Sequence, residues 1–146
     1  MQRKRCLLLF LATIFLANCN LALGEPVGPS PDSPWELSVY QPDGKPVRLG
    51  NFATGKRLTV LLILGADCPL SQKAVTEVAN DLAKSGASER AGLLGLLVGR
   101  DDAQDIERLR QEFKVAFPLF LDRRNTVASK LGVKVVPTAV LLDEQG

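Results

Sequence analysis

The sequence contains no histidine and only three cysteines among its 146 residues, and this shortage limits the chemistry that the chain can perform. Histidine and cysteine are common ligands of zinc and copper, so we expect neither a structural site for these metals nor a role in copper delivery. Catalytic triads that need a histidine base are excluded for the same reason. Aromatic residues make up 5% of the chain and are scattered, which argues against a surface that binds nucleic acid.

The first residues of the chain deviate most from an average composition. Basic residues occupy positions 3–5, an apolar segment covers 6–17, and the sequence at 22–24 is Ala-Leu-Gly. The apolar segment has about twelve residues, whereas a membrane-spanning helix needs roughly twenty. We therefore predict a cleaved signal peptide over residues 1–24 rather than a permanent anchor, and export to the periplasm or another extracytoplasmic compartment.

A second processing site would give a different mature protein. The sequence Leu16-Ala17-Asn18-Cys19 partly fits a bacterial lipobox, in which Cys19 would be lipidated and would tether the domain to a membrane. Asn18 is a poor residue before a lipidated cysteine, so soluble export is favoured and membrane association is expected only if Cys19 carries a lipid. Residues 1–24 hold three of the 18 basic residues and none of the 16 acidic ones, so their removal changes the formal net charge from +2 to −1.

The rest of the chain divides into a linker and one domain. Residues 25–34 contain four prolines and no apolar periodicity, as expected for an extended linker. The domain over 35–146 opens with two short apolar segments, 37–40 and 46–49, on either side of Asp43-Gly44. This dipeptide is typical of a hairpin turn in which both residues have positive φ, so we predict an opening β-hairpin.

Strands and helices alternate through the domain. Continuous aliphatic runs indicate strands buried on both faces, and helical spacing of apolar residues, with Asp101 and Asp102 as caps, indicates helices. The expected strands cover 58–65, 91–98, 117–121 and 138–142, and the expected helices run from Pro69 to Gly86, from Asp101-Asp102 through Phe113, and over 125–131. This order predicts an α/β sandwich, a central mixed sheet with helices on both faces. The sequence stops at a turn signal, so we expect a truncated domain with an unpaired edge.

Cys68 is the cysteine that remains once residues 1–24 are removed, and it lies where a buried strand ends and Pro69 begins a helix. A thiol reacts as its thiolate, which the N–H groups and dipole at a helix N-terminus stabilise. The carboxylate of Asp67 opposes this effect, and the residues alone do not decide which influence prevails. A lone cysteine can also be a small inert core residue, but the carboxyl edge of the sheet favours an exposed thiol.

Five motifs in the same order resemble the thioredoxin-like superfamily, in particular the redoxin branch called the alkyl hydroperoxide reductase/thiol-specific antioxidant (AhpC/TSA) family. They are Asp43 to Leu49, Leu64 to Ser71, Phe117 to Leu119 with Asp122, Leu131 to Thr138, and Leu141 to Gly146. The resemblance implies a thioredoxin-like fold whose final hairpin strand and helix are missing here. It also implies a cis peptide at Val136-Pro137 and a groove in which Val136, Pro137 and Pro69 bind substrate beside Cys68. Without the resemblance, Pro137 reads equally well as a proline that begins a strand.

The chain also departs from the patterns of that superfamily. Its active-site sequence is Cys68-Pro69-Leu70-Ser71, so Ser71 replaces the second thiol of a Cys-x-x-Cys dithiol, and Asp67 stands where tryptophan is usual. Peroxidases of the family need a threonine where this chain has Gly65, and an arginine near a position that is Asn125 here. A self-contained dithiol cycle is thus excluded, and any oxidised form of Cys68 needs an external thiol for its recovery.

These observations favour an exported protein similar to thiol-disulfide oxidoreductases that uses one cysteine and no cofactor. In this interpretation the Cys68 thiolate attacks a disulfide or peroxide of a protein or small molecule, while Ser71 and the first N–H groups of the helix hydrogen-bond the sulfur. One alternative is a one-cysteine peroxidase with antioxidant activity, in which Arg124 polarises the peroxide. The other is a non-catalytic binding domain or lipoprotein module that holds a partner in the groove at Pro137.

Overall fold

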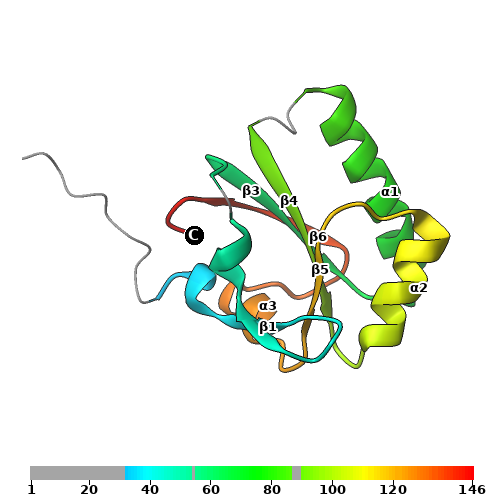
Figure 1. The fold of residues 1–146 in the computed structure, drawn as a ribbon, viewed down its shortest axis with the longest axis horizontal. Coiled ribbons are helices and arrows are strands. Elements are labelled where there is room, and N and C mark those ends of the chain that lie inside the picture. Colours follow the sequence, from blue (N-terminus) through cyan, green and yellow to red (C-terminus); the bar gives the residue numbers. More distant parts are fainter. Residues whose placement is uncertain (1–31, 54, 87–89) are drawn as a thin grey trace, which may run out of the picture.

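A six-stranded mixed β-sheet in the order β2-β1-β5-β4-β3-β6 forms the centre of the structure (Figure 1). The computed structural model describes residues 32–146 except residue 54 and residues 87–89. The strands are β1 (Ser38–Tyr40), β2 (Pro46–Arg48), β3 (Leu58–Leu64), β4 (Ala91–Val98), β5 (Leu119–Asp122) and β6 (Thr138–Asp143). The helices are α1 (Pro69–Lys84), α2 (Ala103–Phe113) and α3 (Thr126–Lys130), with short 3-10 helices η1 (Pro34–Glu36) and η2 (Leu49–Phe52).

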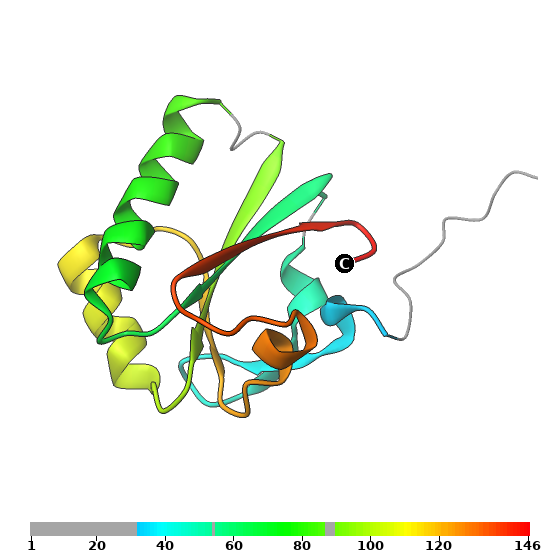
Figure 2. The same cartoon turned by 180° about the vertical axis from the view of Figure 1, so that it is seen from behind.

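Helices cover both faces of this sheet, as the alternation of elements predicted. Figures 1 and 2 show α1 and α2 together on one side, and α3 with the two 3-10 helices on the other. Because successive side chains of a strand point to opposite faces, β3 contributes to both cores. Leu62 and Leu64 pack with Val75, Ile106 and Leu109 of the helices, whereas Leu61 and Ile63 belong to the second core. That second core contains Trp35, Val39, Leu49, Phe120, Val127 and Leu142. The predicted α/β sandwich with a mixed sheet is therefore confirmed.

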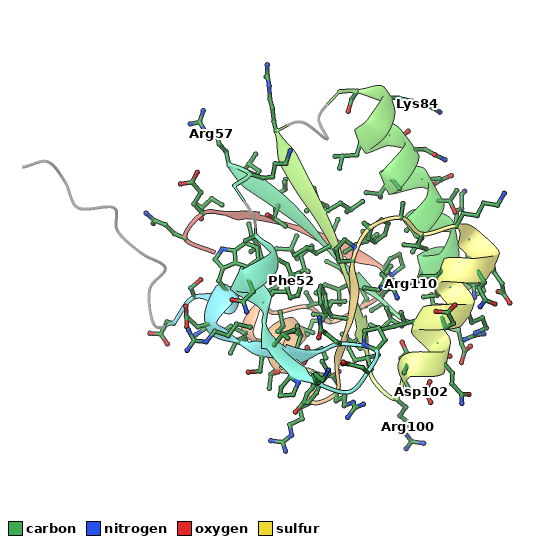
Figure 3. All side chains as sticks on the ribbon, in the orientation of Figure 1. Phe52, Arg57, Lys84, Arg100, Asp102 and Arg110 are labelled. Atoms are coloured by element: carbon green, nitrogen blue, oxygen red, sulfur yellow. The ribbon has the colours of Figure 1, made fainter. Side chains whose placement is uncertain are left out.

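The strand directions bring four chain segments to one edge of the sheet. β3, β4 and β5 run parallel, and β6 runs antiparallel to β3. The carboxyl ends of the three parallel strands and the beginning of β6 therefore meet at the same edge. Arg100 and Asp102, which follow β4, lie at this edge in Figure 3, and Arg57 and Lys84 lie at the opposite end.

The opening hairpin forms as predicted, but its turn differs. β1 pairs with β2 in antiparallel register, and β1 joins the sheet through β5. Gly44 has a φ of +82°, whereas Asp43 is not among the residues with positive φ. The N–H of Gly44 donates to the carbonyl of Gln41 at 2.9 Å, and the N–H of Lys45 donates to the carboxylate of Asp43 at 3.0 Å. The expectation of two positive φ values was wrong because a wider turn, supported by the Asp43 side chain, needs left-handed geometry at glycine alone.

The two ends of the described chain meet at Trp35. This residue is 2% exposed, and its indole Nε1 donates a hydrogen bond of 2.9 Å to the carbonyl of Asp143 at the end of β6. β3 is the neighbour of β6 in the sheet, and within the described residues no strand pairs with the other edge of β6. None of the helices in this part of the chain is both long and apolar enough to cross a membrane. The predicted signal peptide, Cys19 and residues 25–31 of the linker lie outside the described residues.

Candidate thiol site at the start of helix α1

Cys68 lies directly before α1, where a tight turn joins β3 to the helix. The N–H of Cys68 donates to the carbonyl of Gly65 at 3.1 Å and closes the turn. The carbonyl of Cys68 accepts a hydrogen bond of 3.0 Å from the N–H of Gln72, the first bond of the helix. Cys68 thus occupies the N-cap position and Pro69 the first helical position, where a missing N–H costs no hydrogen bond. The thiol is half-buried and unpaired with another cysteine.

Hydrogen bonds at the start of the helix lower the pKa of the Cys68 thiol from its ordinary value of 9.0. The largest contribution comes from the backbone N–H of Ser71, followed by the Ser71 hydroxyl, and the N–H of Leu70 adds to them, while partial burial opposes them. Ser71 is 1% exposed, and its hydroxyl oxygen accepts a hydrogen bond of 3.1 Å from the N–H of Gly65. Since the oxygen acts as the acceptor in that bond, the hydroxyl hydrogen can be donated to the sulfur of Cys68. This arrangement favours the thiolate, the reactive form of cysteine.

The carboxylate of Asp67 is held away from this hydrogen-bonding system. Its Oδ1 lies 2.8 Å from a guanidinium nitrogen of Arg108 in α2, and the same nitrogen lies 2.7 Å from the carboxylate of Asp105. This ion pair places a positive charge beside the carboxylate of Asp67. Of the two opposing influences that the sequence left open, the hydrogen bonds at the helix start lower the pKa of Cys68, while Arg108 compensates the charge of Asp67.

The loop before β6 lies beside the thiol. Its Val136-Pro137 peptide bond is cis, and the Cys68 sulfur lies 4.0 Å from the carbonyl oxygen of Val136, the outer limit of a thiol hydrogen bond. Val136 also lies close to the turn. A Cβ atom built on Gly65 would be 3.3 Å from Cγ2 of Val136 and 3.7 Å from Cβ of Cys68. Two exposed apolar side chains flank the site, Leu70 at 65% exposure and Val135 at 70%. The structure therefore brings Cys68, Pro69, Ser71, Val136 and Pro137 together.

Two residues of the site, Asp101 and Gln72, were missed by the sequence analysis. A carboxylate oxygen of Asp101 accepts a hydrogen bond of 2.9 Å from the N–H of Ala66, and Gln72 Nε2 donates to the carbonyl of Ala66 at 2.9 Å. The prediction that Asp101 and Asp102 together cap a helix was wrong for Asp101. Asp102 caps α2 by itself, in a capping box with Asp105. The sequence offered one signal for this role: Asp102 is enough to cap α2, so the acidic residue before it, Asp101, was available for another contact.

Partial burial raises the pKa of the Asp101 carboxyl group. The Ala66 N–H opposes this rise, the carboxylates of Asp105 and Asp67 add to it, and the guanidinium of Arg108 counteracts them. Asp101 is thus a carboxylate turned inward toward the backbone of the thiol loop.

Arg124, the candidate for polarising a peroxide, lies in the exposed turn between β5 and α3. Within the described residues, no ion pair or hydrogen bond joins its side chain to the turn that carries Cys68. The preceding Arg123 stacks over the ring of Tyr40 at 4.8 Å, and the side chain of the following Asn125 accepts a hydrogen bond of 2.9 Å from the N–H of Gly99. Asn125 therefore stabilises the loop that follows β4. Among the described residues, Arg124 has no hydrogen bond or ion pair at this sheet edge.

Known structures share this architecture at low sequence identity. The chain is similar to MTB dsbF, with a TM-score of 0.63 and 20% identity over 77% of this chain and 81% of that one. A thiol-disulfide oxidoreductase from Bacteroides fragilis NCTC 9343 gives a TM-score of 0.64 and 16% identity over 78% and 85% of the two chains. A secreted Mycobacterium tuberculosis disulfide oxidoreductase homologous to E. coli DsbE gives 0.58 and 13% over 75% and 84%. No curated protein sequence matches the chain significantly.

The fold is thus thioredoxin-like and shared with thiol-disulfide oxidoreductases. The sequence pattern of the AhpC/TSA family matches residues 31–146, which include the opening hairpin, the Cys68 turn and the cis-proline loop. This match covers all of the described domain and most of the chain, and by it the protein belongs to the AhpC/TSA family.

Proposed function

We propose that this chain is an exported thiol-disulfide exchange protein that acts through the single thiol of Cys68. The observation that carries the proposal is the position of Cys68 directly before α1 and beside the cis-proline loop, with its sulfur 4.0 Å from the carbonyl oxygen of Val136. The N–H groups at the start of α1 and the hydroxyl of Ser71 lower the pKa of this thiol, which agrees with that position. A half-buried position leaves the sulfur within reach of a partner. Export rests on the signal-peptide pattern of residues 1–24, and a structurally similar disulfide oxidoreductase is described as secreted.

The reaction proceeds by two exchange steps. The Cys68 thiolate attacks one sulfur of a substrate disulfide, a mixed disulfide forms between Cys68 and that sulfur, and the other substrate sulfur leaves as a thiolate. An external thiolate then attacks the mixed disulfide and releases Cys68 as the thiolate. Ser71 and the first N–H groups of α1 stabilise the anion at the beginning and at the end of this cycle. Because Ser71 takes the place of a second thiol, no intramolecular step competes with the external reductant.

The substrate would lie against the loop beside the thiol. The carbonyl oxygen of Val136 lies 4.0 Å from the sulfur, and Pro69 follows Cys68 at the start of α1, so an extended polypeptide that carries a disulfide can bind along the loop at Val136 and Pro137. The exposed Leu70 and Val135 provide apolar surface at the rim. Proteins with partly unfolded, disulfide-bonded segments are therefore more suitable substrates than small charged disulfides.

The rate of alkylation by iodoacetamide, measured as a function of pH, tests the proposal because it reports the fraction of thiolate. We expect Cys68, followed by peptide mass spectrometry in the full chain, to titrate at lower pH than free cysteine. The mature domain of Cys68→Ser has no other cysteine, so we expect the same reagent to leave it unmodified. A titration at or above the pH of free cysteine would rule out an activated thiol. The chain would then be better described as a non-catalytic binding domain.

The peroxidase alternative receives less support from the geometry. A threonine at Gly65 would have to displace Val136, and Arg124 has no contact with the turn in the described residues. We expect hydrogen peroxide to be consumed slowly, and at similar rates by the wild type and by Cys68→Ser once background is subtracted. Rapid consumption that depends on Cys68 and on Arg124 would instead favour the one-cysteine peroxidase.

A further inference from the structure

The turn that carries the thiol is held from outside at Ala66. Its N–H donates to the carboxylate of Asp101, and its carbonyl accepts from the amide of Gln72, each over 2.9 Å. The methyl group of Ala66 is fully buried. Asp101 comes from the loop after β4 and Gln72 from the first turn of α1, so two separate elements hold the backbone of one residue on its two polar sides.

Ala66 belongs to the turn that carries Cys68. It is the second residue of the turn that the Cys68 N–H closes on the carbonyl of Gly65 at 3.1 Å. A displacement of Ala66 would therefore move Cys68 relative to the N–H groups of Ser71 and Leu70. Hydrogen bonds weaken steeply when their angle departs from linearity, so a small movement of the turn is enough to reduce stabilisation of the thiolate.

Helix capping does not explain the orientation of Asp101. Asp102 accepts hydrogen bonds from the N–H groups of Gln104 and Asp105 at 2.7 and 3.2 Å, and the Asp105 carboxylate accepts from the N–H of Asp102 at 3.0 Å. The start of α2 is therefore complete without Asp101. The inward carboxylate of Asp101 has Ala66 as its hydrogen-bond partner, which links the loop after β4 to the thiol turn.

We propose that Asp101 is a positioning residue for Cys68: its carboxylate oxygen holds Ala66, and Ala66 keeps the sulfur against the first N–H groups of α1. Gln72 supports the same residue from the opposite side. The inference rests on the proposed function, because it concerns the reactivity of the same thiol. It adds that this reactivity depends on a hydrogen-bond acceptor in a distant part of the sequence.

The test compares the alkylation rate of Cys68, resolved from Cys6 and Cys19 by peptide mass spectrometry, and the thermal stability of the full chain. The variants are the wild type, Asp101→Ala, Asp101→Asn and Asp102→Ala. Asp101→Ala removes the acceptor, and we expect alkylation at neutral pH to slow by about threefold or more, the order expected when one hydrogen bond is lost. Asp101→Asn keeps an oxygen at the same place and is expected to react nearly like the wild type. Asp102→Ala is the matched control, because it loses a helix cap and some stability without contact to the turn, and its thiol should react normally.

Three results would overturn the inference. They are an unchanged rate in folded Asp101→Ala, an equal slowing in Asp102→Ala, and a slowing in Asp101→Asn as large as in Asp101→Ala. If Asp101→Ala does not fold, Gln72→Met decides, since it removes the hydrogen bond on the other side of Ala66 and keeps a helix-forming side chain. A wild-type rate in Gln72→Met would then count against the inference. Failure of the proposed function is recognised separately, because in that case the wild-type thiol itself would titrate like free cysteine.

Discussion

Replacement of Ser71 by alanine tests two hydrogen bonds of the thiol site at once. The hydroxyl accepts from the N–H of Gly65 at 3.1 Å and donates to the sulfur of Cys68. Loss of the acceptor leaves a partly buried N–H without a partner, which costs about 1–2 kcal/mol in the free energy of unfolding. At about 4 °C per kcal/mol for a domain of this size, the melting temperature should fall by about 4–8 °C.

The same change should also make the thiol less reactive. One of the three donors that lower the pKa of Cys68 is removed, while the backbone N–H groups of Ser71 and Leu70 remain. We expect alkylation at neutral pH to slow by about three- to tenfold, the order expected when one hydrogen bond of ordinary strength is lost.

The pH dependence of stability has a defined sign. Because the folded-state pKa of Cys68 is lowered, ionisation of the thiol stabilises the fold fully above the unfolded-state pKa, and this contribution is lost as the pH falls through the folded-state pKa. The stability difference between wild type and Ser71→Ala should therefore be larger at pH 9 than at pH 6.

Urea denaturation at both pH values, combined with iodoacetamide alkylation followed by mass spectrometry, measures these effects. Ser129→Ala is a suitable control, since Ser129 is an exposed serine in α3. The reasoning would be refuted if Ser71→Ala reacted at the wild-type rate and lost equal stability at both pH values. In that case the hydroxyl would serve only the turn and not the sulfur.

Three further variants address other parts of the structure. Ser71→Cys restores a Cys-x-x-Cys spacing, so we expect an intramolecular disulfide with Cys68, detectable by mass spectrometry as the loss of two hydrogens; a stable dithiol under oxidising conditions would contradict this. Gly95→Ala places a Cβ atom against the side chain of Leu119. Urea denaturation should show a free energy of unfolding lower by about 1–3 kcal/mol, and an unchanged midpoint would disprove the close packing. Arg108→Ala removes the cation paired with the carboxylate next to the thiol, so alkylation should slow at low ionic strength and recover at high salt, whereas a difference independent of salt would exclude an electrostatic cause.

The fold was predictable because its signals are local. The aliphatic run of β3 is long enough to identify a strand covered on both faces, and Pro69, after the short turn that follows it, marks the start of a helix. Together they place Cys68 between strand and helix from the sequence alone. The Asp43-Gly44 dipeptide likewise predicted the place of the hairpin turn, and Gly44 has the left-handed conformation expected there. The type of turn was not predictable, because it depends on a hydrogen bond to the side chain of Asp43 that the dipeptide does not specify.

The surroundings of the thiol could not be predicted in the same way. Asp101 meets Ala66 across 35 positions of the chain, and Arg108 meets Asp67 across 41. Both contacts depend on where α2 packs beside α1, which periodicity does not determine. The sequence therefore showed two opposing influences on Cys68, and only the position of Arg108 revealed how the negative charge of Asp67 is compensated.

Trp35 gives this protein a built-in optical signal. It is the only tryptophan of the chain, and its indole is enclosed where the first turn meets the last strand. Asp143, whose carbonyl it binds, pairs with Leu58 at the beginning of β3, whereas Cys68 follows the other end of that strand. Fluorescence from this indole should therefore shift to longer wavelength when the N- and C-terminal parts of the domain separate. Unfolding could be followed by light emission in every cysteine variant, with no label attached to the sulfur.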